Sequence, residues 1–318
     1  MTISTGQRWN TRRVTILALR WLIPVAIIGG FIATGQLSDA ISALSRVSLV
    51  WAGPLIATGI ALPISHAWRW VYLLRRTGSD VPVFESVRVT SLASLINYAA
   101  PGFLGAPAKA ILVRDSRSVP LSRSLPTLAA EQLLDAGMLA LAGSTVLFLS
   151  GPTMLEAIAG QVTVDDSLIA LATVVAIVSV AIVMLLASRR YLPGFVERVR
   201  QATLELVSSR EHIRPIAMLT LARWVLDMGA VGIASVAVGL RLGLLEILLI
   251  ANLSLLVGLI APVPGGLGVR EAAMAFLAGA IGVSVPAVLA LSLLHRAGLA
   301  IGLPVALGGA RILEWGRR

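Results

Sequence analysis

The sequence predicts an all-α fold: a polytopic membrane helical bundle with two broken re-entrant helical hairpins that form an inverted-topology repeat. Hydrophobic residues make up 57% of the 318 positions and charged residues only 13%, which is far from the composition of a soluble domain. The apolar residues form continuous runs and do not alternate with polar ones, so they indicate membrane helices. Because no polar stretch is long enough to fold separately, residues 1–318 are expected to form a single domain.

Several apolar runs are long enough to cross a bilayer as helices, which takes about 20 mostly apolar residues. They lie near residues 14–34, 48–68, 122–150, 167–188, 214–240 and 287–310. The first run follows arginines, as a signal peptide does, but its apolar part is too long and lacks a cleavage site. We therefore expect a retained helix there. Two further apolar stretches, 84–114 and 243–282, are each interrupted midway.

The distribution of basic residues predicts the orientation. Arginine and lysine collect at the N-terminus and within 69–88, 109–123, 189–214 and 311–318. By the positive-inside rule these regions, and hence both termini, are cytoplasmic. The stretch 151–166 carries Glu156, Asp165 and Asp166 and no basic residue, so it is expected outside. These observations predict a multi-pass protein of the bacterial cytoplasmic (inner) membrane.

The two interrupted stretches are predicted to be hairpins. If 65–88 and 109–123 are both cytoplasmic, the chain between them must enter and leave the membrane on one side. The segment NYAAPGFLGAP supplies the turn, because proline removes a donor and glycine permits unusual dihedral angles. The same argument makes 243–282, which contains LIAPVPGGLGVREAAM, a hairpin that enters from outside.

The two hairpin tips also resemble each other. PGFLGAPAKA at 101–110 and PGGLGVREAA at 264–273 share the pattern P-G-x-L-G, which predicts repeats over about 48–150 and 214–314. Inverted repeats with broken helices are typical of transporters. Helix N-termini after the breaks, near Ala106 and Val269, would attract an anion such as a phosphate. Alternatively, glycine and proline here only kink or pack membrane helices.

Ionisable residues inside the predicted spans usually face a pathway or a partner. Glu131 and Asp135 lie four residues apart on one helix face, where like charges repel unless one is protonated or a cation intervenes. They are candidates for a proton relay, or for pairing with Arg296 on the corresponding span of the other repeat. The alternative interpretation is a static buried ion pair.

Arg270 and Glu271 follow the second break, where arginine can bind a phosphate through two hydrogen bonds and glutamate can orient it or accept a proton. Lys109 occupies a related place in the first hairpin. His295, beside Arg296, is a further candidate functional residue.

Other features predict anchoring and not chemistry. Residues 189–213 mix arginine with apolar residues at helical spacing, which predicts an amphipathic helix on the cytoplasmic surface. Arg223 and Asp227 have the spacing of a local salt bridge, and His66 and His212 are expected at the interface. The net charge of +10 indicates anionic lipid head groups as partners and not nucleic acid. No cysteine, Walker loop or zinc signature occurs, so we expect no enzyme activity, cofactor or metal.

The segments NYAAPGFLGAPAKA, EQLLDAG, PVPGGLGVREAAM and HRAGLAIGLP, in this order, resemble the lysylphosphatidylglycerol synthase transmembrane region, also called the flippase-like domain. The resemblance spans nearly the whole chain. In the two-part synthases this region is thought to move aminoacylated phosphatidylglycerol between leaflets, while a soluble domain transfers the amino acid. Since no such soluble domain is expected here, the resemblance implies translocation by a stand-alone member, a branch associated with lipids, hopanoids or polyprenyl-linked sugars.

The resemblance and the charge pattern together give the candidate substrate-binding or translocation residues, with no catalytic residue among them. They are Asn97, Pro101, Gly102, Gly105, Lys109, Glu131, Asp135, Pro264, Gly265, Gly266, Gly268, Arg270, Glu271, His295 and Arg296. The family's first tip often reads P-G-R-x-G-E, whereas Phe103 and Ala106 stand at its charged positions here. Gln132 also replaces an arginine that often follows the glutamate, which leaves the head group open.

The leading hypothesis is a lipid translocase (flippase) that moves an anionic or modified phospholipid, or a related lipid, across the cytoplasmic membrane. The alternatives are a flippase for a polyprenyl-phosphate-linked sugar or a hopanoid-type lipid, an enzyme subunit that modifies a lipid-linked sugar, and a non-transporting membrane partner of a lipid or glycan synthase. The expected partners are accordingly membrane lipids and a lipid or glycan biosynthetic enzyme. The sequence leaves the oligomeric state open.

Overall fold

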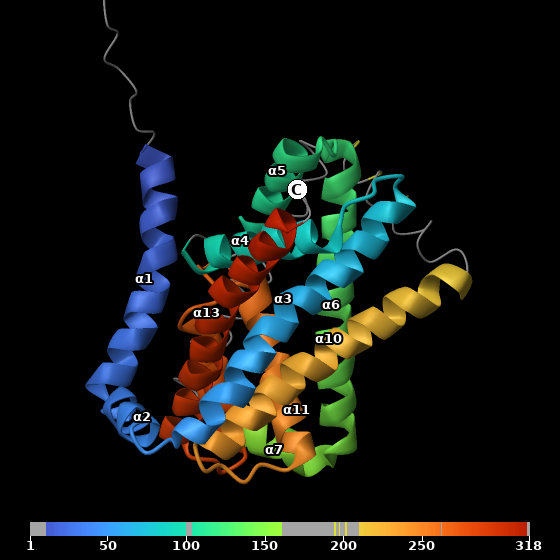
Figure 1. Cartoon of the computed structure of the whole chain (residues 1–318). Coiled ribbons are helices and arrows are strands. Elements are labelled where there is room, and N and C mark those ends of the chain that lie inside the picture. Colours follow the sequence, from blue (N-terminus) through green and yellow to red (C-terminus); the bar gives the residue numbers. More distant parts are fainter. Residues whose placement is uncertain are drawn as a thin grey trace, which may run out of the picture.

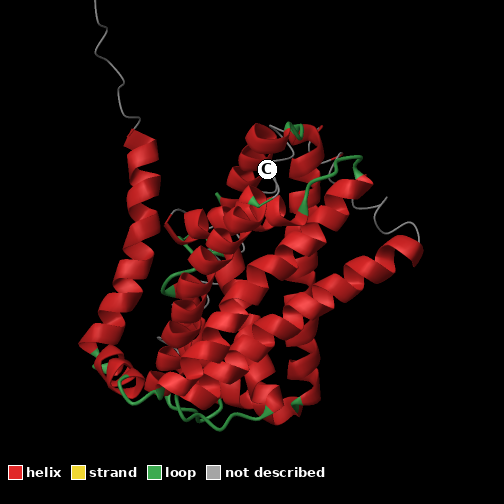
Figure 2. Cartoon of the chain, viewed as in Figure 1, coloured by secondary structure: helices red, strands yellow, loops and turns green. Residues whose placement is uncertain are grey.

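The computed structural model of the protein describes residues 11–99, 104–160, 194, 197, 201, 210–261 and 263–316. The regular elements of these ranges are all helices, as predicted (Figure 2). They are α1 (Thr11–Ala33), α2 (Gln36–Leu44), the 3-10 turn η1 (Leu49–Trp51), α3 (Ala52–Arg76), α4 (Val83–Ala99), α5 (Gly105–Arg117), α6 (Leu121–Leu149), α7 (Gly151–Gly160), α10 (Arg210–Ala237), α11 (Leu244–Ile260), α12 (Val269–Ala280) and α13 (Val285–Trp315).

The long helices match the predicted spans at 122–150, 214–240 and 287–310, whereas the span predicted at 48–68 is eight residues longer at its C-terminal end. Within the described residues, helices at Leu49–Arg76, Leu121–Leu149, Ile213–Ala237 and Val285–Trp315 are long and apolar enough to cross a membrane. A fifth span is present if α1 and α2, which meet at a bend of 81°, are counted as one. The predicted span at 167–188 and most of the predicted amphipathic helix at 189–213 lie outside the described residues.

The first predicted span, 14–34, ends where helix α1 ends, but the turn and the helix that follow it were not expected. Helix α1 stops at Ala33, and the chain turns at Gly35, whose φ of 75° a residue with a side chain rarely adopts. Helix α2 then runs across the end of the bundle and packs on α13 (Figure 1). Helix α1 itself stands at the edge of the bundle and contacts α12.

Both interrupted stretches are broken helices, as predicted. Helix α4 ends at Ala99 and α5 starts at Gly105, while α11 ends at Ile260 and α12 starts at Val269. The second break requires glycine at three positions, because Gly265, Gly266 and Gly268 have φ of 54°, 65° and 76°. A Cβ on Gly266 would also lie 2.9 Å from the backbone of Gly258, so the tip folds tightly back on α11.

The centre of the bundle is the contact between α3 and α13, which is close because glycines face each other. A Cβ on Gly59 would lie 2.2 Å from the carbonyl oxygen of Gly298, and a Cβ on Gly302 would lie 2.3 Å from the carbonyl carbon of Gly59. Small residues at this spacing let membrane helices approach to backbone contact. Helix α13 also packs on α4, α12 and α10, so it connects the other helices.

The helices fall into two groups with the same order of lengths. Helices α3, α4, α5 and α6 have 25, 17, 13 and 29 residues, and α10, α11, α12 and α13 have 28, 17, 12 and 31. Figure 1 shows α3 and α10 running in opposite directions, and α6 and α13 likewise. Helices α4 and α5 lie toward the end of the bundle where α13 finishes, and α11 lies toward the other end.

Candidate functional site

Buried charged side chains form two clusters in the described helices. The first cluster comprises His66 and Arg69 of α3, Lys109 of α5, Glu131 and Asp135 of α6, and Arg223 and Asp227 of α10. The second cluster comprises Arg270 and Glu271 of α12 and Ser292, His295 and Arg296 of α13. Each cluster therefore joins a helix from a broken pair to the long helix that follows it.

Arg69 is the centre of the first cluster. Its side chain is fully buried, and its two terminal nitrogens donate to the carboxylate oxygens of Asp135 at 2.6 and 2.9 Å. The Nη2 atom also lies 3.3 Å from Glu131 Oε1. A two-point arginine–carboxylate pair is among the strongest hydrogen-bonded arrangements, and it is strengthened further where water is excluded.

The remaining charges of the first cluster are also paired. Lys109 Nζ donates to Glu131 Oε2 at 3.1 Å and lies 4.2 Å from the centre of the Trp70 ring. Arg223 bridges Asp135 and Asp227, each at 2.9 Å. Three basic groups thus face three carboxylates, with His66 between Glu131 and Arg223. The cluster balances its own charge when the histidine is neutral.

Two expectations need correction here. Arg69 was expected at the cytoplasmic surface, but α3 continues to Arg76 and so places Arg69 inside the bundle. The expected pairing of Glu131 and Asp135 with Arg296 is wrong, because arginines and a lysine from α3, α5 and α10 reach these carboxylates instead. His66 packs against this cluster. The predicted Arg223–Asp227 bridge is confirmed.

Glu271 organises the second cluster. Its Oε1 atom accepts hydrogen bonds from Arg296 Nε at 2.8 Å and from the Ser292 hydroxyl at 2.7 Å, and Oε2 accepts from the backbone N–H of Gly268 at 2.9 Å. Arg296 Nη1 then donates to the carbonyl oxygen of Gly265 at 3.0 Å. The carboxylate therefore fixes both the start of α12 and the side chain that holds the glycine tip.

Arg270 has no carboxylate partner among the described residues. Its side chain is only 5% exposed, yet no carboxylate of the described residues lies within 4.0 Å of its guanidinium. Its polar neighbour is His295, whose Nδ1 lies 3.4 Å from Arg270 Nη2. Arg270 Nε and His295 Nε2 are both buried with no hydrogen-bond partner. A buried cation without an anion is costly, so this position suits an anionic ligand.

The two breaks meet at the second cluster. A Cβ built on Gly265 would lie 3.3 Å from the Tyr98 ring and 3.7 Å from the carbonyl oxygen of Asn97, both near the end of α4. The Asn97 side chain in turn accepts the backbone N–H of Gly105 at 2.7 Å, which joins the two sides of the first break. A side chain on Gly105 would overlap Asn97, so the pair requires glycine.

The helix starts after the breaks are less open than expected. Helices α5 and α12 do begin near Ala106 and at Val269, but Gly105 N–H is occupied by Asn97 and Gly268 N–H by Glu271. Because these side chains cap the helices, the predicted attraction of an anion to free N–H groups is reduced at both starts. Among the described residues near these helix starts, the guanidinium of Arg270 is the group left to attract an anion.

The structure brings most of the predicted site residues into these two clusters and the glycine tip between them. Pro264, Gly266 and Gly268 are buried in that tip, whereas Pro101 and Gly102 lie outside the described residues. Sequence reasoning missed Arg69, Tyr98 and Ser292. Of these three, only Arg69 had a signal in the sequence, because it is a lone arginine inside the apolar segment SHAWRWVYLL. Among the described residues, no three His, Cys, Asp or Glu side chains gather as metal ligands would.

Comparison with known proteins gives one family. The model of the family described as "Lysylphosphatidylglycerol synthase TM region" matches residues 21–308, which include every residue of both clusters. No curated protein and no solved structure matches the chain.

Proposed function

Because the chain belongs to the family of the lysylphosphatidylglycerol synthase transmembrane region, we propose that it is a lipid translocase of the cytoplasmic membrane. Its lipid would be an anionic or modified phospholipid, or a related lipid that carries phosphate. The protein would act as a transporter and not as an enzyme, as a single domain over residues 1–318 with both termini cytoplasmic.

The observation that carries this proposal is the unpaired, buried Arg270 at the meeting point of the two breaks. A phosphate oxygen at this guanidinium would receive the hydrogen bonds that Arg270 Nε lacks, and it would supply the missing negative charge. The second cluster has two arginines against one carboxylate, so it has one surplus positive charge when His295 is neutral. That surplus matches the single negative charge of a phosphodiester.

The first cluster would have a different role in transport. Its charges are mutually paired, and its members come from α3, α5, α6 and α10, so it ties the first group of helices to the start of the second. We propose that it is a charge-paired contact that must rearrange as the helices move. Glu131 and Asp135 would exchange partners during this step, while the lipid tails remain in the bilayer.

The proposed movement is alternating access between two inverted halves, 48–150 and 214–314, with the two broken pairs as re-entrant hairpins. Support comes from the shared tip pattern P-G-x-L-G, the matching order of helix lengths and the opposite courses of corresponding helices in Figure 1. In such transporters the substrate site lies where broken helices meet. Here the corresponding place is the tip at Gly265, where an added Cβ would lie 3.3 Å from the Tyr98 ring at the end of α4.

The test is leaflet exchange of labelled lipids in proteoliposomes. The panel contains phosphatidylglycerol, aminoacylated phosphatidylglycerol, a polyprenyl-phosphate sugar and a hopanoid, so that it separates the candidate substrates. We expect exchange of a phosphate-containing lipid by the wild type and its loss in Arg270→Ala and Glu271→Gln. Arg75→Ala, at an exposed surface ion pair, serves as the control.

Two results would contradict the proposal. Lipid exchange that is unchanged in both Arg270→Ala and Glu271→Gln would show that the second cluster is not the binding site. No exchange of any lipid by folded wild type would instead favour a non-transporting partner of a lipid or glycan synthase.

A further inference from the structure

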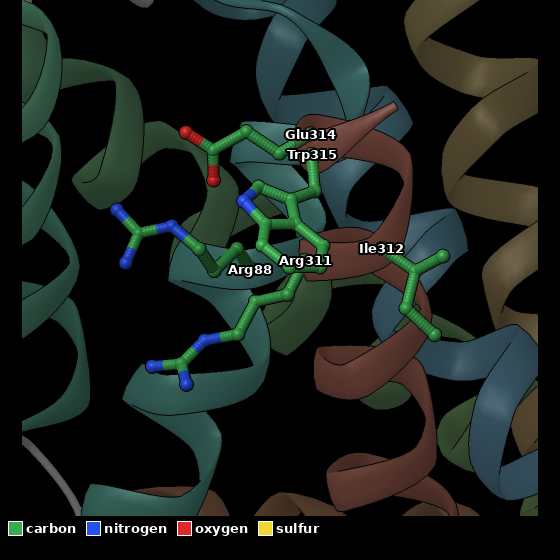
Figure 3. Close-up of a pocket in the computed structure, with 5 residues that line it drawn as sticks. All are labelled: Arg88, Arg311, Ile312, Glu314 and Trp315. Atoms are coloured by element: carbon green, nitrogen blue, oxygen red, sulfur yellow. The ribbon is translucent and has the colours of Figure 1, made fainter. Parts of the chain in front are cut away.

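A separate pocket lies at the far end of α13, away from the glycine tip. It has a volume of about 330 Å³ and is lined by Arg88 of α4 and by Arg311, Ile312, Glu314 and Trp315 of α13 (Figure 3). An adjoining hollow of about 360 Å³ shares Arg88 and Glu314 and adds Glu85, Ser116 and Arg117. The site therefore joins the start of α4, the end of α5 and the end of α13.

The length of α13 places this pocket at the membrane surface. Its 31 residues, at about 1.5 Å each, extend roughly 46 Å, which exceeds the hydrocarbon core of about 30 Å. The last turn nevertheless has exposed apolar side chains, since Ile312 is 73% and Trp315 83% exposed. Tryptophan beside arginine at the end of a span is typical of the lipid head-group region. The basic residues of this end put it in the cytoplasmic leaflet.

The charges around the pocket leave a positive surplus. Arg88, Arg117 and Arg311 line the two hollows together with the carboxylates of Glu85 and Glu314. Glu85 is buried and engages Arg88 through two hydrogen bonds of 2.6 and 3.0 Å, which fixes the Arg88 side chain. One positive charge remains over the carboxylates, which is the charge that a phosphodiester would balance.

The geometry in Figure 3 suits a lipid head group. The guanidinium groups of Arg88 and Arg311 extend to the same side of the pocket in this view, and the Trp315 ring lies between them and α13. The Trp315 ring thus lies next to two groups that bind phosphate, whereas the Ile312 side chain, which also lines the pocket, points to the other side of α13 in this view. We propose that this pocket binds the phosphate of an anionic phospholipid of the cytoplasmic leaflet, with Trp315 against its glycerol and upper acyl chains.

Arg117 and Arg311 also have an explanation that needs no ligand, because they lie near the C-termini of α5 and α13, where cations interact favourably with the helix dipole. The experiment must therefore measure bound lipid directly. Native mass spectrometry of the full-length protein, released from detergent in the presence of phosphatidylglycerol or phosphatidylcholine, counts the lipids that remain bound. Arg311→Gln is the main variant and Arg117→Gln the second. Arg241→Gln, an exposed arginine outside the pocket, is the matched control for loss of one charge.

We expect the wild type to retain phosphatidylglycerol in preference to phosphatidylcholine. Each pocket variant should weaken retention of phosphatidylglycerol about fivefold, the effect of one basic residue at a membrane surface. Arg241→Gln should retain it as the wild type does. Equal weakening in Arg241→Gln, or none in either pocket variant, would overturn the proposal.

Two further experiments distinguish lipid binding in this pocket from binding of free phosphate and from lipid binding at the second cluster. Inorganic phosphate and the head group glycerophosphoglycerol, added as competitors, should displace the bound lipid poorly because they lack the apolar part. Efficient displacement by inorganic phosphate would overturn the lipid assignment. In Arg270→Gln the pocket should still retain phosphatidylglycerol. Loss of retention in Arg270→Gln alone would locate the bound lipid at the second cluster and would also overturn this proposal.

Discussion

Arg69 and Arg270 are both buried arginines inside the helix bundle, but they differ in their partners. Arg69 is held by Asp135 through two short hydrogen bonds and approaches Glu131 as well. Arg270 has only the weak contact with His295. A paired buried charge contributes to structure. An unpaired buried charge destabilises the fold, and it is found where a ligand supplies the missing opposite charge. This contrast supports our proposal that the first cluster serves structure and movement and that the second binds the lipid.

The pairing of Arg69 can be tested by Asp135→Asn. This change leaves Arg69 and Arg223 without their shared carboxylate, and removing one partner of a buried pair costs about 3–5 kcal/mol. The free energy of unfolding in detergent, followed by chemical denaturation, measures this loss. Asp80→Asn is the control, because the Arg75–Asp80 pair is exposed and such pairs contribute about 0–1 kcal/mol. Similar small losses in both variants would show that the first cluster is not a structural pairing.

Among the helices, the contact of α3 with α13 controls the position of both clusters. Helix α3 carries Arg69, and α13 carries His295 and Arg296. Gly59, Gly298 and Gly302 bring the two backbones together, so side chains there would push the helices apart.

We expect Gly302→Leu to destabilise the protein by at least about 1–3 kcal/mol, because the core at this point has no room for a side chain. Lipid exchange should fall with it, since α13 would shift relative to α3. Gly309→Leu, in the same helix, should have little effect because an added Cβ meets no atom within 4 Å and the residue is exposed. Thermal unfolding of the two variants side by side gives the comparison, and an equal effect of both would contradict close packing at Gly302.

The helices themselves could be predicted well from the sequence, because span length and glycine–proline breaks are local properties. The spans at 122–150 and 287–310 and the breaks near Gly105 and Gly268 all agree with the structure. The partners of the charged residues could not be predicted. Glu131 pairs with side chains 22 and 62 residues away in the chain, and that choice depends on how α3, α5 and α6 pack. Helix α2 and the sharp turn before it were missed, because its nine residues are too few for a membrane span and only spans of about 20 residues were sought.

For the whole molecule, the two groups of helices predict opposite sides of the membrane for two exposed residues, Asp115 and Arg241. If the halves are inverted, Asp115 near the end of α5 is cytoplasmic and Arg241 before α11 is external. The chain has no cysteine, so single cysteines can be introduced without background. We expect a membrane-impermeant maleimide to label Arg241→Cys in intact cells and Asp115→Cys only after the membrane is opened. Labelling of both from the same side would contradict the inverted arrangement.

The central claim is that the positive charge of Arg270 binds the lipid phosphate, and its most direct test is leaflet exchange by Arg270→Lys and Arg270→Gln in proteoliposomes. Lysine keeps the charge and loses the two-point geometry, so we expect it to retain part of the wild-type rate. Glutamine keeps a polar side chain without charge and should abolish exchange, while the protein stays folded. Equal rates in wild type, Arg270→Lys and Arg270→Gln would contradict phosphate binding at Arg270.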